Sequence, residues 1–378
     1  MQETKRTGAQ EKLFYTAEDL RNCTFDLNYC GMCIYGRRDN SGHNSTAGAD
    51  IDSKQENVAD KRILPGNGEK RQSMRIGLID VDGHNFPSLP LMKISAYHKQ
   101  IGDTVDWYEP LFSGHMDKVY MSKVFSFTED YEYFVDADEV EKGGTGYFYP
   151  NGGESLPDEI EHTYPDYSIY HDRIPETKNT AYGFLTRGCP RGCNFCIVGK
   201  KEGTTAKKVA DLSEFWRGQT NIVLLDANMF ACKEWKELSN QLIKSEAWVD
   251  FSQGCDIRTM TQEKAEHIKR MKIKRIHFAW DRYEEKEIVV RKLKGFQKIT
   301  GWGRDRMGVY VLCNFNTEFE QDLERVYTLR ELGYAPYVML YDKQNIPKGH
   351  RLRRLQRWVN NRIVFNTCAR FEDYDSSK

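Results

Sequence analysis

Short apolar runs and amphipathic stretches alternate along the chain from Met74 to its carboxyl end. Six apolar runs in the second half have the length of buried strands, and the segments between them carry apolar residues at helical spacing. The expected strands cover residues 181–185, 221–225, 249–252, 275–279, 308–313 and 336–340. The expected helices cover residues 233–244, 262–271, 284–299 and 318–332. This repeated pattern predicts an α/β fold with parallel strands.

The same alternation begins earlier in the chain. Residues 75–80 (RIGLID) predict a buried strand, residues 90–101 a helix, and residues 104–108 and 118–125 two further strands, before a turn-rich segment at residues 143–147. A strand–helix–strand order at this spacing predicts a doubly wound parallel sheet of the Rossmann-like type. Ligands of such a sheet bind at the carboxyl ends of its strands.

The amino-terminal 73 residues have a different composition. Residues 39–73 are rich in Asn, Ser, Gly and charged residues and have almost no apolar periodicity, which predicts a disordered extension. We therefore expect an extension (1–73), a Rossmann-like unit with a linker (74–178) and a second unit ending in a helix (179–378). The extension contains Cys23, Cys30, Cys33 and His43, which could together hold zinc. The favoured interpretation is that the three cysteines are free thiols.

Composition and charge narrow the class of protein. With 378 residues, 39% of them hydrophobic, the chain can form two folded units. Residues 179–378 contain 36 Lys and Arg against 25 Asp and Glu, whereas residues 1–178 contain 19 against 31. This asymmetry indicates a basic face for an anionic partner, mutual attraction of the two units, or solvated helix faces, and we favour the last. Neither a signal peptide nor a membrane-spanning run is visible, so we expect a cytoplasmic protein with reduced thiols and no membrane partner.

Cys189, Cys193 and Cys196 stand out within the run TRGCPRGCNFC, directly after the first expected strand of the second unit. Three cysteines within eight residues indicate a metal site. A closed structural site uses four protein ligands, whereas three thiolates on a 4Fe-4S cluster leave one iron open for a substrate or cofactor. The alternative is a zinc site completed by His171 or Cys255.

The triad, with the aromatic Phe195 before its last cysteine, resembles the signature of the radical S-adenosylmethionine (SAM) superfamily. The resemblance implies a 4Fe-4S cluster whose open iron binds SAM. It also implies reductive cleavage of SAM to a 5′-deoxyadenosyl radical, fed by an electron donor such as flavodoxin or ferredoxin. The six strand–helix units match the partial (β/α)6 barrel of that superfamily.

Polar residues at the expected strand ends are candidates for SAM contacts, because barrel enzymes place their chemistry there. The second strand ends in Asp226-Ala227-Asn228, where the superfamily commonly has a Gly-Gly-Glu-like turn. Asp226 or Asn228 can accept hydrogen bonds from the SAM ammonium group. After the third strand, Gln253, Asp256 and Arg258 resemble ribose and carboxylate contacts, and Arg258 suits a carboxylate fork.

The remaining strand ends are less specific. Asp281 and Arg282 follow the fourth strand, Asn314 and Asn316 the fifth, and Asp342 the sixth. Asp and Asn also favour helix N-caps, so each of them is either a cap or a ligand contact. No catalytic residue and no adenine contact is assigned from the sequence.

The first unit resembles the cobalamin-binding module that precedes many radical SAM cores. In that module a D-x-H-x-x-G loop supplies a histidine ligand to cobalt. Asp82 and His84 match this motif, but Pro87 stands in the place of the glycine and cannot form the same turn. We therefore expect the unit to shape the substrate cavity without binding cobalamin, and His84 to be structural.

Two alternative functions stay open. One is a cobalamin-dependent radical SAM methyltransferase or methylthiotransferase-like enzyme. The other, from a different class, is a zinc-dependent nucleic-acid-binding module, motivated by the basic second half and the cysteine-rich runs. That second interpretation lacks the repeated aromatic and basic platform of single-strand binders, although nucleic acid stays open as a partner. The substrate is not predicted.

Overall fold

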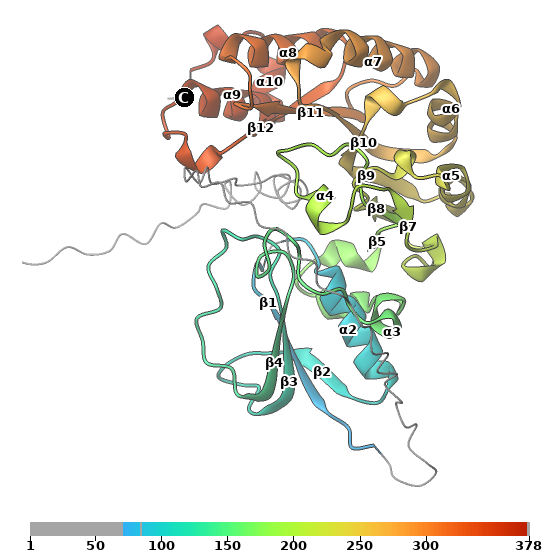
Figure 1. Cartoon of the computed structure of the whole chain (residues 1–378), viewed down its shortest axis with the longest axis vertical. Helices are drawn as coiled ribbons and strands as arrows, with labels where there is room; N and C mark the ends of the chain where they lie inside the picture. Colours follow the sequence, from blue (N-terminus) through green and yellow to red (C-terminus); the bar gives the residue numbers. More distant parts are fainter. Residues whose placement is uncertain (1–70, 84, 376–378) are drawn as a thin grey trace, which may run out of the picture.

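The structure is a computed structural model that describes residues 71–83 and 85–375. It contains a four-stranded sheet and a six-stranded sheet, both entirely parallel, and a short two-stranded antiparallel ribbon (Figure 1). The chain is therefore an α/β protein, as the alternation of apolar runs predicts. Cys23, Cys30, Cys33, His43 and His84, the alternative metal ligands considered from the sequence, lie outside the described residues.

The four-stranded sheet comes first in the chain. Its strands are β1 (Arg75–Asp80), β2 (Thr104–Trp107), β3 (Met116–Ser122) and β4 (Ala137–Gly143), and its helices are α2 (Leu89–Gln100) and α3 (Asp158–Glu161). The strand order β2-β1-β3-β4 reverses direction at β1, as in a doubly wound sheet. Helix α2 connects β1 to β2, but the connections from β2 to β3 and from β3 to β4 contain no helix.

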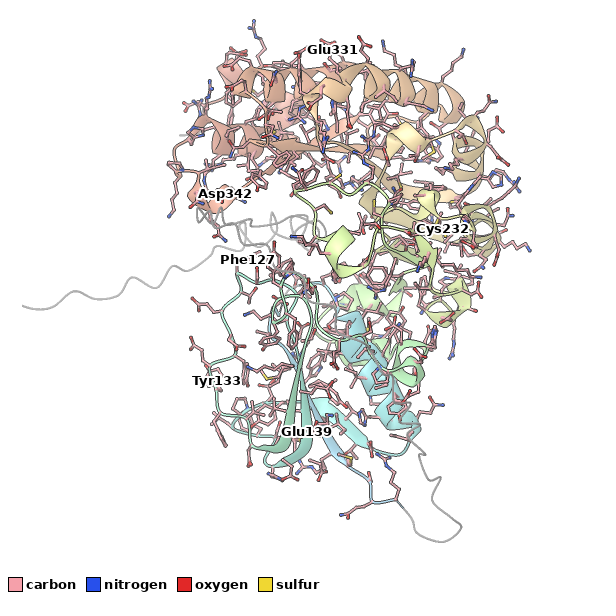
Figure 2. All side chains as sticks on the ribbon, in the orientation of Figure 1. Phe127, Tyr133, Glu139, Cys232, Glu331 and Asp342 are labelled. Atoms are coloured by element: carbon pink, nitrogen blue, oxygen red, sulfur yellow. The ribbon has the colours of Figure 1, made fainter. Side chains whose placement is uncertain are left out.

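Strand β4 is absent from the sequence prediction because its residues are exposed along almost the whole strand. It therefore shows no apolar run and no alternation. Its backbone pairs with β3 from Ala137 to Gly143, and Lys118 Nζ forms ion pairs with Glu139 (2.9 Å) and Glu141 (2.7 Å). Glu139 lies on this outer strand (Figure 2). Charged side chains of this kind are typical of edge strands.

The six-stranded sheet has its strands in chain order, β12-β11-β10-β9-β8-β5. Its strands are β5 (Thr180–Gly183), β8 (Asn221–Leu224), β9 (Trp248–Cys255), β10 (Lys272–Trp280), β11 (Met307–Cys313) and β12 (Ala335–Leu340). Its helices are α5 (Trp235–Ser245), α6 (Gln262–Arg270), α7 (Lys286–Thr300), α8 (Phe319–Glu331), α9 (Arg351–Asn360) and α10 (Arg362–Thr367). All six strands overlap the predicted ones, and β9 and β10 are longer than predicted.

Because every crossover in this sheet proceeds in the same direction, right-handed connections place the helices on one face. Figure 1 shows α5 to α8 along the outside of the sheet, and the outward side of α8 carries Glu331 (Figure 2). The carboxyl ends of all six strands therefore lie at one edge, where the loops that follow them meet.

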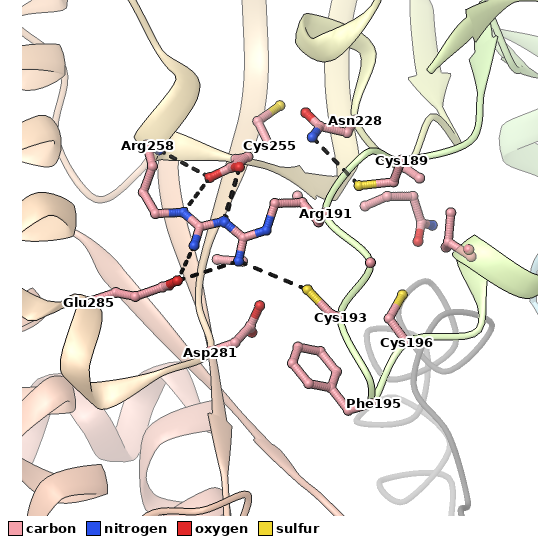
Figure 3. Close-up of a pocket in the computed structure, with 18 residues that line it drawn as sticks. Cys189, Arg191, Cys193, Phe195, Cys196, Asn228, Cys255, Arg258, Asp281 and Glu285 are labelled. Carbon is pink, nitrogen blue, oxygen red and sulfur yellow. Dashed lines mark hydrogen bonds and ion pairs between the residues drawn. The ribbon is translucent and has the colours of Figure 1, made fainter. Parts of the chain in front are cut away.

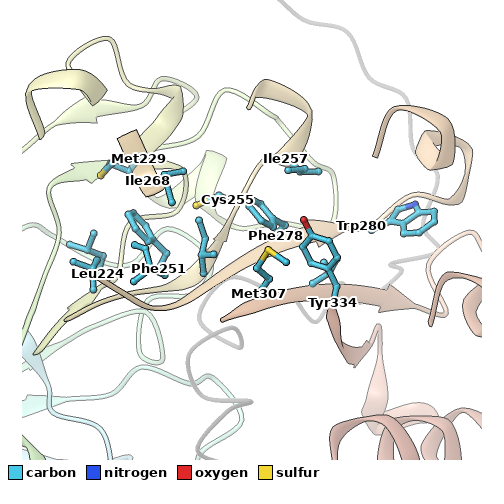
Figure 4. Packing of buried hydrophobic residues seen from close by; sticks show 14 of the residues in the cluster. Leu224, Met229, Phe251, Cys255, Ile257, Ile268, Phe278, Trp280, Met307 and Tyr334 are labelled. Carbon is cyan, nitrogen blue, oxygen red and sulfur yellow. The ribbon is translucent and has the colours of Figure 1, made fainter. Parts of the chain in front are cut away.

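Apolar side chains fill most of the core between this sheet and its helices. Leu224, Phe251 and Phe278 come from three neighbouring strands and belong to the same buried cluster as Ile268 of α6, and each is at most 3% exposed (Figure 4). Phe278 also meets Phe296 of α7 edge to face at 4.9 Å between ring centroids. Burying each such side chain contributes about 2 kcal/mol. The strand ends are thus anchored to a well-packed platform.

Two tyrosines of the 3-10 helix η1 (Tyr167–Tyr170) connect the two sheets. The Tyr170 hydroxyl donates to Asp80 Oδ2 (2.6 Å) and accepts from the backbone N–H of Ser88 (3.0 Å). The Tyr167 hydroxyl accepts from the backbone N–H of Tyr182 on β5 (3.0 Å). Burial raises the pKa of Asp80 to about 6.

Candidate functional site

The three cysteines lie on a loop that leaves the carboxyl end of β5. The ribbon of β6 (Thr186–Arg187) and β7 (Lys207–Lys208) closes the base of this loop, and the short helix α4 (Val198–Lys201) follows the last cysteine. Gly188 has φ +87°, and a Cβ atom there would lie 2.2 Å from the carbonyl oxygen of Thr205. Only glycine therefore fits at the point where the chain turns into the cysteine run.

Asp226, at the end of β8, holds the start of this loop. Its carboxylate accepts hydrogen bonds from the backbone N–H groups of Leu185 (3.0 Å) and Thr186 (2.5 Å) and from the Thr186 hydroxyl (2.6 Å). Burial raises the pKa of Asp226 to about 6. Asp226 does not line the cavity described below, so its position differs from that of a SAM ammonium contact.

A cavity opens between the cysteine loop and the ends of β8, β9 and β10 (Figure 3). Eight of the nine site residues assigned from the sequence line it. They are Cys189, Cys193, Phe195, Cys196, Asn228, Gln253, Asp256 and Arg258. Residues separated by up to 69 positions in the chain are therefore brought together at the strand ends.

The sulfur of each of the three motif cysteines accepts one N–H donor. Asn228 Nδ2 donates to Cys189 Sγ (3.7 Å), Arg191 Nη2 donates to Cys193 Sγ (3.9 Å), and the backbone N–H of Val198 donates to Cys196. Burial raises the pKa of Cys193 and raises that of Cys196 to about 12, so both are neutral thiols near neutral pH without a bound metal. A bound metal displaces such protons.

The cavity also contains a network of two arginines and two carboxylates. Arg258 makes a bidentate pair with Asp256 (2.8 and 3.0 Å) and also contacts Glu285. Arg191 pairs with Asp256 (3.2 Å) and with Glu285 (3.6 Å) (Figure 3). Both guanidinium groups are therefore engaged by carboxylates of the protein. Burial raises the pKa of Asp256 to about 6, although the Arg191 charge opposes that rise.

Two further polar groups lie in the cavity. Asn228 is 2% exposed, and its Oδ1 has no hydrogen-bond partner within the described part of the chain. Asp281, the residue after β10, lines the opposite side, and burial raises its pKa to about 6. An unpaired buried acceptor is costly unless a ligand supplies a donor. The Asn228 amide oxygen is therefore suited to a ligand N–H group.

The alternative ligands for a single metal ion are not brought together. Cys255 lines the cavity and is 4% exposed, whereas His171 does not line it. Among residues 71–83 and 85–375, no group of three or more His, Cys, Asp or Glu side chains is placed to hold one metal ion.

Among the polar residues at the strand ends, Asp256 caps a helix with its side chain, whereas Asn314, Asn316 and Asp342 do not. Asp256 caps η5 (Ile257–Thr259) by accepting from the backbone N–H of Arg258 (3.1 Å), in addition to its place in the cavity. Asn314, Asn316 and Asp342 adopt left-handed backbone conformations. They do not line the cavity, but Phe315 between the two asparagines meets Phe195 at 5.0 Å.

Asp82, in the loop that resembles a cobalamin motif, has structural partners. The Asp82 carboxylate accepts from the backbone N–H groups of Val124 and Phe125 and from the Thr128 hydroxyl (2.8 Å). Asp82 therefore fixes the loop after β3 at the carboxyl edge of the first sheet.

Sequence reasoning missed Arg191 and Glu285 as cavity residues. Arg191 lies inside the cysteine motif, and its positive charge next to the cysteines was the sequence feature that could have identified it. Glu285 follows β10 by five residues, and its sequence context resembles any exposed helix start.

Comparison with protein-family models and with curated proteins gave no match. In the part of the chain that the structure describes, no helix combines the length and apolarity needed to cross a bilayer. The chemistry of the cavity residues therefore carries the assignment of function.

Proposed function

We propose that this chain is a radical SAM enzyme in which Cys189, Cys193 and Cys196 hold a 4Fe-4S cluster. The observation that carries the proposal is the convergence of three cysteines in one cavity, each with an N–H donor on its sulfur. N–H donors stabilise thiolates, and metal-bound sulfur commonly receives such bonds. When bound, the cluster supplies one electron that cleaves SAM at its open iron into methionine and a 5′-deoxyadenosyl radical.

The donor set fits a cluster better than one ion. In a 4Fe-4S cluster each thiolate binds a different iron, so the sulfurs need not converge on one point. The three cysteines here line a common cavity without forming a single-ion group among the described residues. Burial raises the pKa of the Cys193 and Cys196 thiols, but metal binding removes their protons because a metal binds the thiolate.

The cavity residues also suit the polar groups of SAM. The unpaired Oδ1 of Asn228 is the proposed acceptor for its ammonium group, since the alternative residue, Asp226, is committed to Leu185 and Thr186. Arg258 is the proposed partner of its carboxylate. That contact requires Arg258 to exchange part of its pairing with Asp256 and Glu285. Phe195 and Gln253 form further parts of the wall.

We also propose that the two sheets form a Rossmann-like domain followed by a partial (β/α)6 barrel. A six-stranded parallel sheet in chain order, with the cysteine loop after its first strand, supports a partial (β/α)6 barrel preceded by a Rossmann-like sheet. The proposal includes an electron donor such as flavodoxin or ferredoxin and a cytoplasmic location. It does not include cobalamin, because Pro87 stands in the place of the glycine of the D-x-H-x-x-G motif.

Replacing each cavity cysteine in turn tests the metal assignment. After anaerobic reconstitution, Cys189→Ala, Cys193→Ala and Cys196→Ala are each expected to lose the four-iron complement and the visible absorption of the cluster. Cys255→Ala is the matched control, since Cys255 lines the same cavity and is the alternative zinc ligand. It is expected to keep four irons. Stoichiometric zinc that depends on Cys255 would contradict the proposal.

A further inference from the structure

Arg191 donates a charged hydrogen bond to one of the cavity sulfurs. It lies between the first two cysteines of the motif, and its side chain crosses the cavity with 22% exposure. Its Nη2 lies 3.9 Å from Cys193 Sγ, and its Nη1 lies 3.2 Å from Asp256 Oδ2. The guanidinium thus contacts a cysteine sulfur, the Asp256 carboxylate just after β9 and the Glu285 carboxylate of η6 (Tyr283–Glu285) (Figure 3).

We propose that Arg191 is a positioning residue that raises the reduction potential of the cluster; this rests on the function proposed above. Reduction adds one electron to the cluster, taken from a one-electron donor of the flavodoxin or ferredoxin class, which is oxidised by one electron. The added negative charge is stabilised by a nearby positive charge and by N–H donors to sulfur. Arg191 supplies both to Cys193.

The other two sulfurs receive neutral donors. Cys189 accepts from the Asn228 amide, and Cys196 accepts from the backbone of Val198. Cys193 alone among the three has a cationic donor in the described structure. Charge-assisted hydrogen bonds are about twice as strong as neutral ones, so Arg191 is the donor with the largest effect on the potential.

The carboxylates that pair with Arg191 act on the cluster with the opposite sign. Glu285 lies 3.6 Å from Arg191 Nη2, the same nitrogen that donates to Cys193, and Glu285 also pairs with Arg258. Two guanidinium and two carboxylate groups make the network neutral, with the positive group next to the sulfur. Removing the charge of Arg191 therefore lowers the potential, whereas removing the charge of Glu285 leaves Arg191 less compensated and raises it.

The test is a redox titration of the anaerobically reconstituted full-length protein, followed by electron paramagnetic resonance of the reduced cluster without SAM. For Arg191→Met we expect a lower midpoint potential. At the wild-type midpoint the ratio of reduced to oxidised cluster should fall about tenfold, which corresponds to a midpoint lower by about 59 mV for a one-electron couple. Arg191→Lys keeps the charge but not the planar fork, so a smaller shift in the same direction is expected. Glu285→Gln should shift the midpoint upward. Lys200→Met, which removes an exposed charge from α4, should leave it unchanged.

If Arg191 and Glu285 had only a structural role, replacing them would change the iron content of the protein but would not shift the midpoint potential in opposite directions. Equal midpoints for wild-type and Arg191→Met protein would overturn the inference, as would a lower midpoint for Glu285→Gln. If Arg191→Met retains no cluster, Arg191→Lys and Glu285→Gln decide, and unchanged midpoints in both overturn the inference. A wild-type protein that binds no iron overturns the proposed function together with this inference, and iron analysis identifies that case before any titration.

Discussion

Arg325 and Asp322, three residues apart on α8, form an ion pair of 2.6 Å in which both side chains are at most 1% exposed. Arg325 also donates to the carbonyl oxygens of Trp280 (2.6 Å) and Leu312 (2.7 Å), near the carboxyl ends of β10 and β11. Asp322 accepts from the backbone N–H of Asn314 (3.2 Å), just after β11. One buried pair thus fixes two strand ends beside the candidate site.

Arg325→Met is expected to be strongly destabilising because it leaves the Asp322 carboxylate buried without its partner. The free energy of unfolding should fall by about 3–5 kcal/mol in urea titrations. The matched control is Arg351→Met on α9, which removes an exposed ion pair with Glu320 of α8 and should cost no more than about 1 kcal/mol. Equal losses in the two variants would show that burial of the Arg325 pair has no special effect.

Gly188→Ala is expected to disrupt the base of the cysteine loop. The new Cβ would approach the Thr205 carbonyl oxygen to 2.2 Å at a φ of +87°, so the loss of unfolding free energy should exceed about 3 kcal/mol. Gly192→Ala is the control in the same loop, because its φ is +56° and a Cβ there meets no atom within 4 Å. That variant should lose about 1–2 kcal/mol. A Gly188→Ala protein as stable as Gly192→Ala would contradict the geometry of the loop.

Asp80→Asn is expected to change the pH dependence of stability. The pKa of Asp80 rises from 3.8 to about 6 in the folded protein because the carboxyl is buried, so the folded state binds its proton more tightly than the unfolded state. The associated stability is fully present below about pH 3.8 and is lost as the pH rises through about 6. Relative to the variant, wild-type protein should therefore lose on the order of 2–3 kcal/mol between pH 4 and pH 8. Parallel unfolding curves for the two proteins across this range would rule out the shift.

The buried strands were predictable from the sequence because both faces of a parallel sheet are covered, as in β11, where every residue is buried. Their order in the sheet follows from short right-handed crossovers. Strand β4 was not predictable, because backbone pairing with β3 and the ion pairs of Lys118 stabilise it, and its exposed residues leave no apolar signal.

The candidate site was predictable as far as residue type and strand ends define it. The three cysteines and the residues after β9 share one cavity, as expected. The choice between Asp226 and Asn228 was not predictable, because it depends on which side chain of one tight turn points to the cavity and which points to the backbone of Leu185 and Thr186. The roles of Arg191 and Glu285 depend on contacts across 94 residues of chain and have no local signature.

Formation of 5′-deoxyadenosine is the measurement that tests the proposed function most directly. Cluster-loaded protein is reduced without oxygen, incubated with SAM and assayed for nucleoside products by mass spectrometry. The wild-type protein is expected to release 5′-deoxyadenosine and methionine in equal amounts, and Cys193→Ala is expected to release none. A wild-type protein that carries four irons, becomes reduced and still leaves SAM intact would contradict the assignment, as would a Cys193→Ala variant as active as wild type.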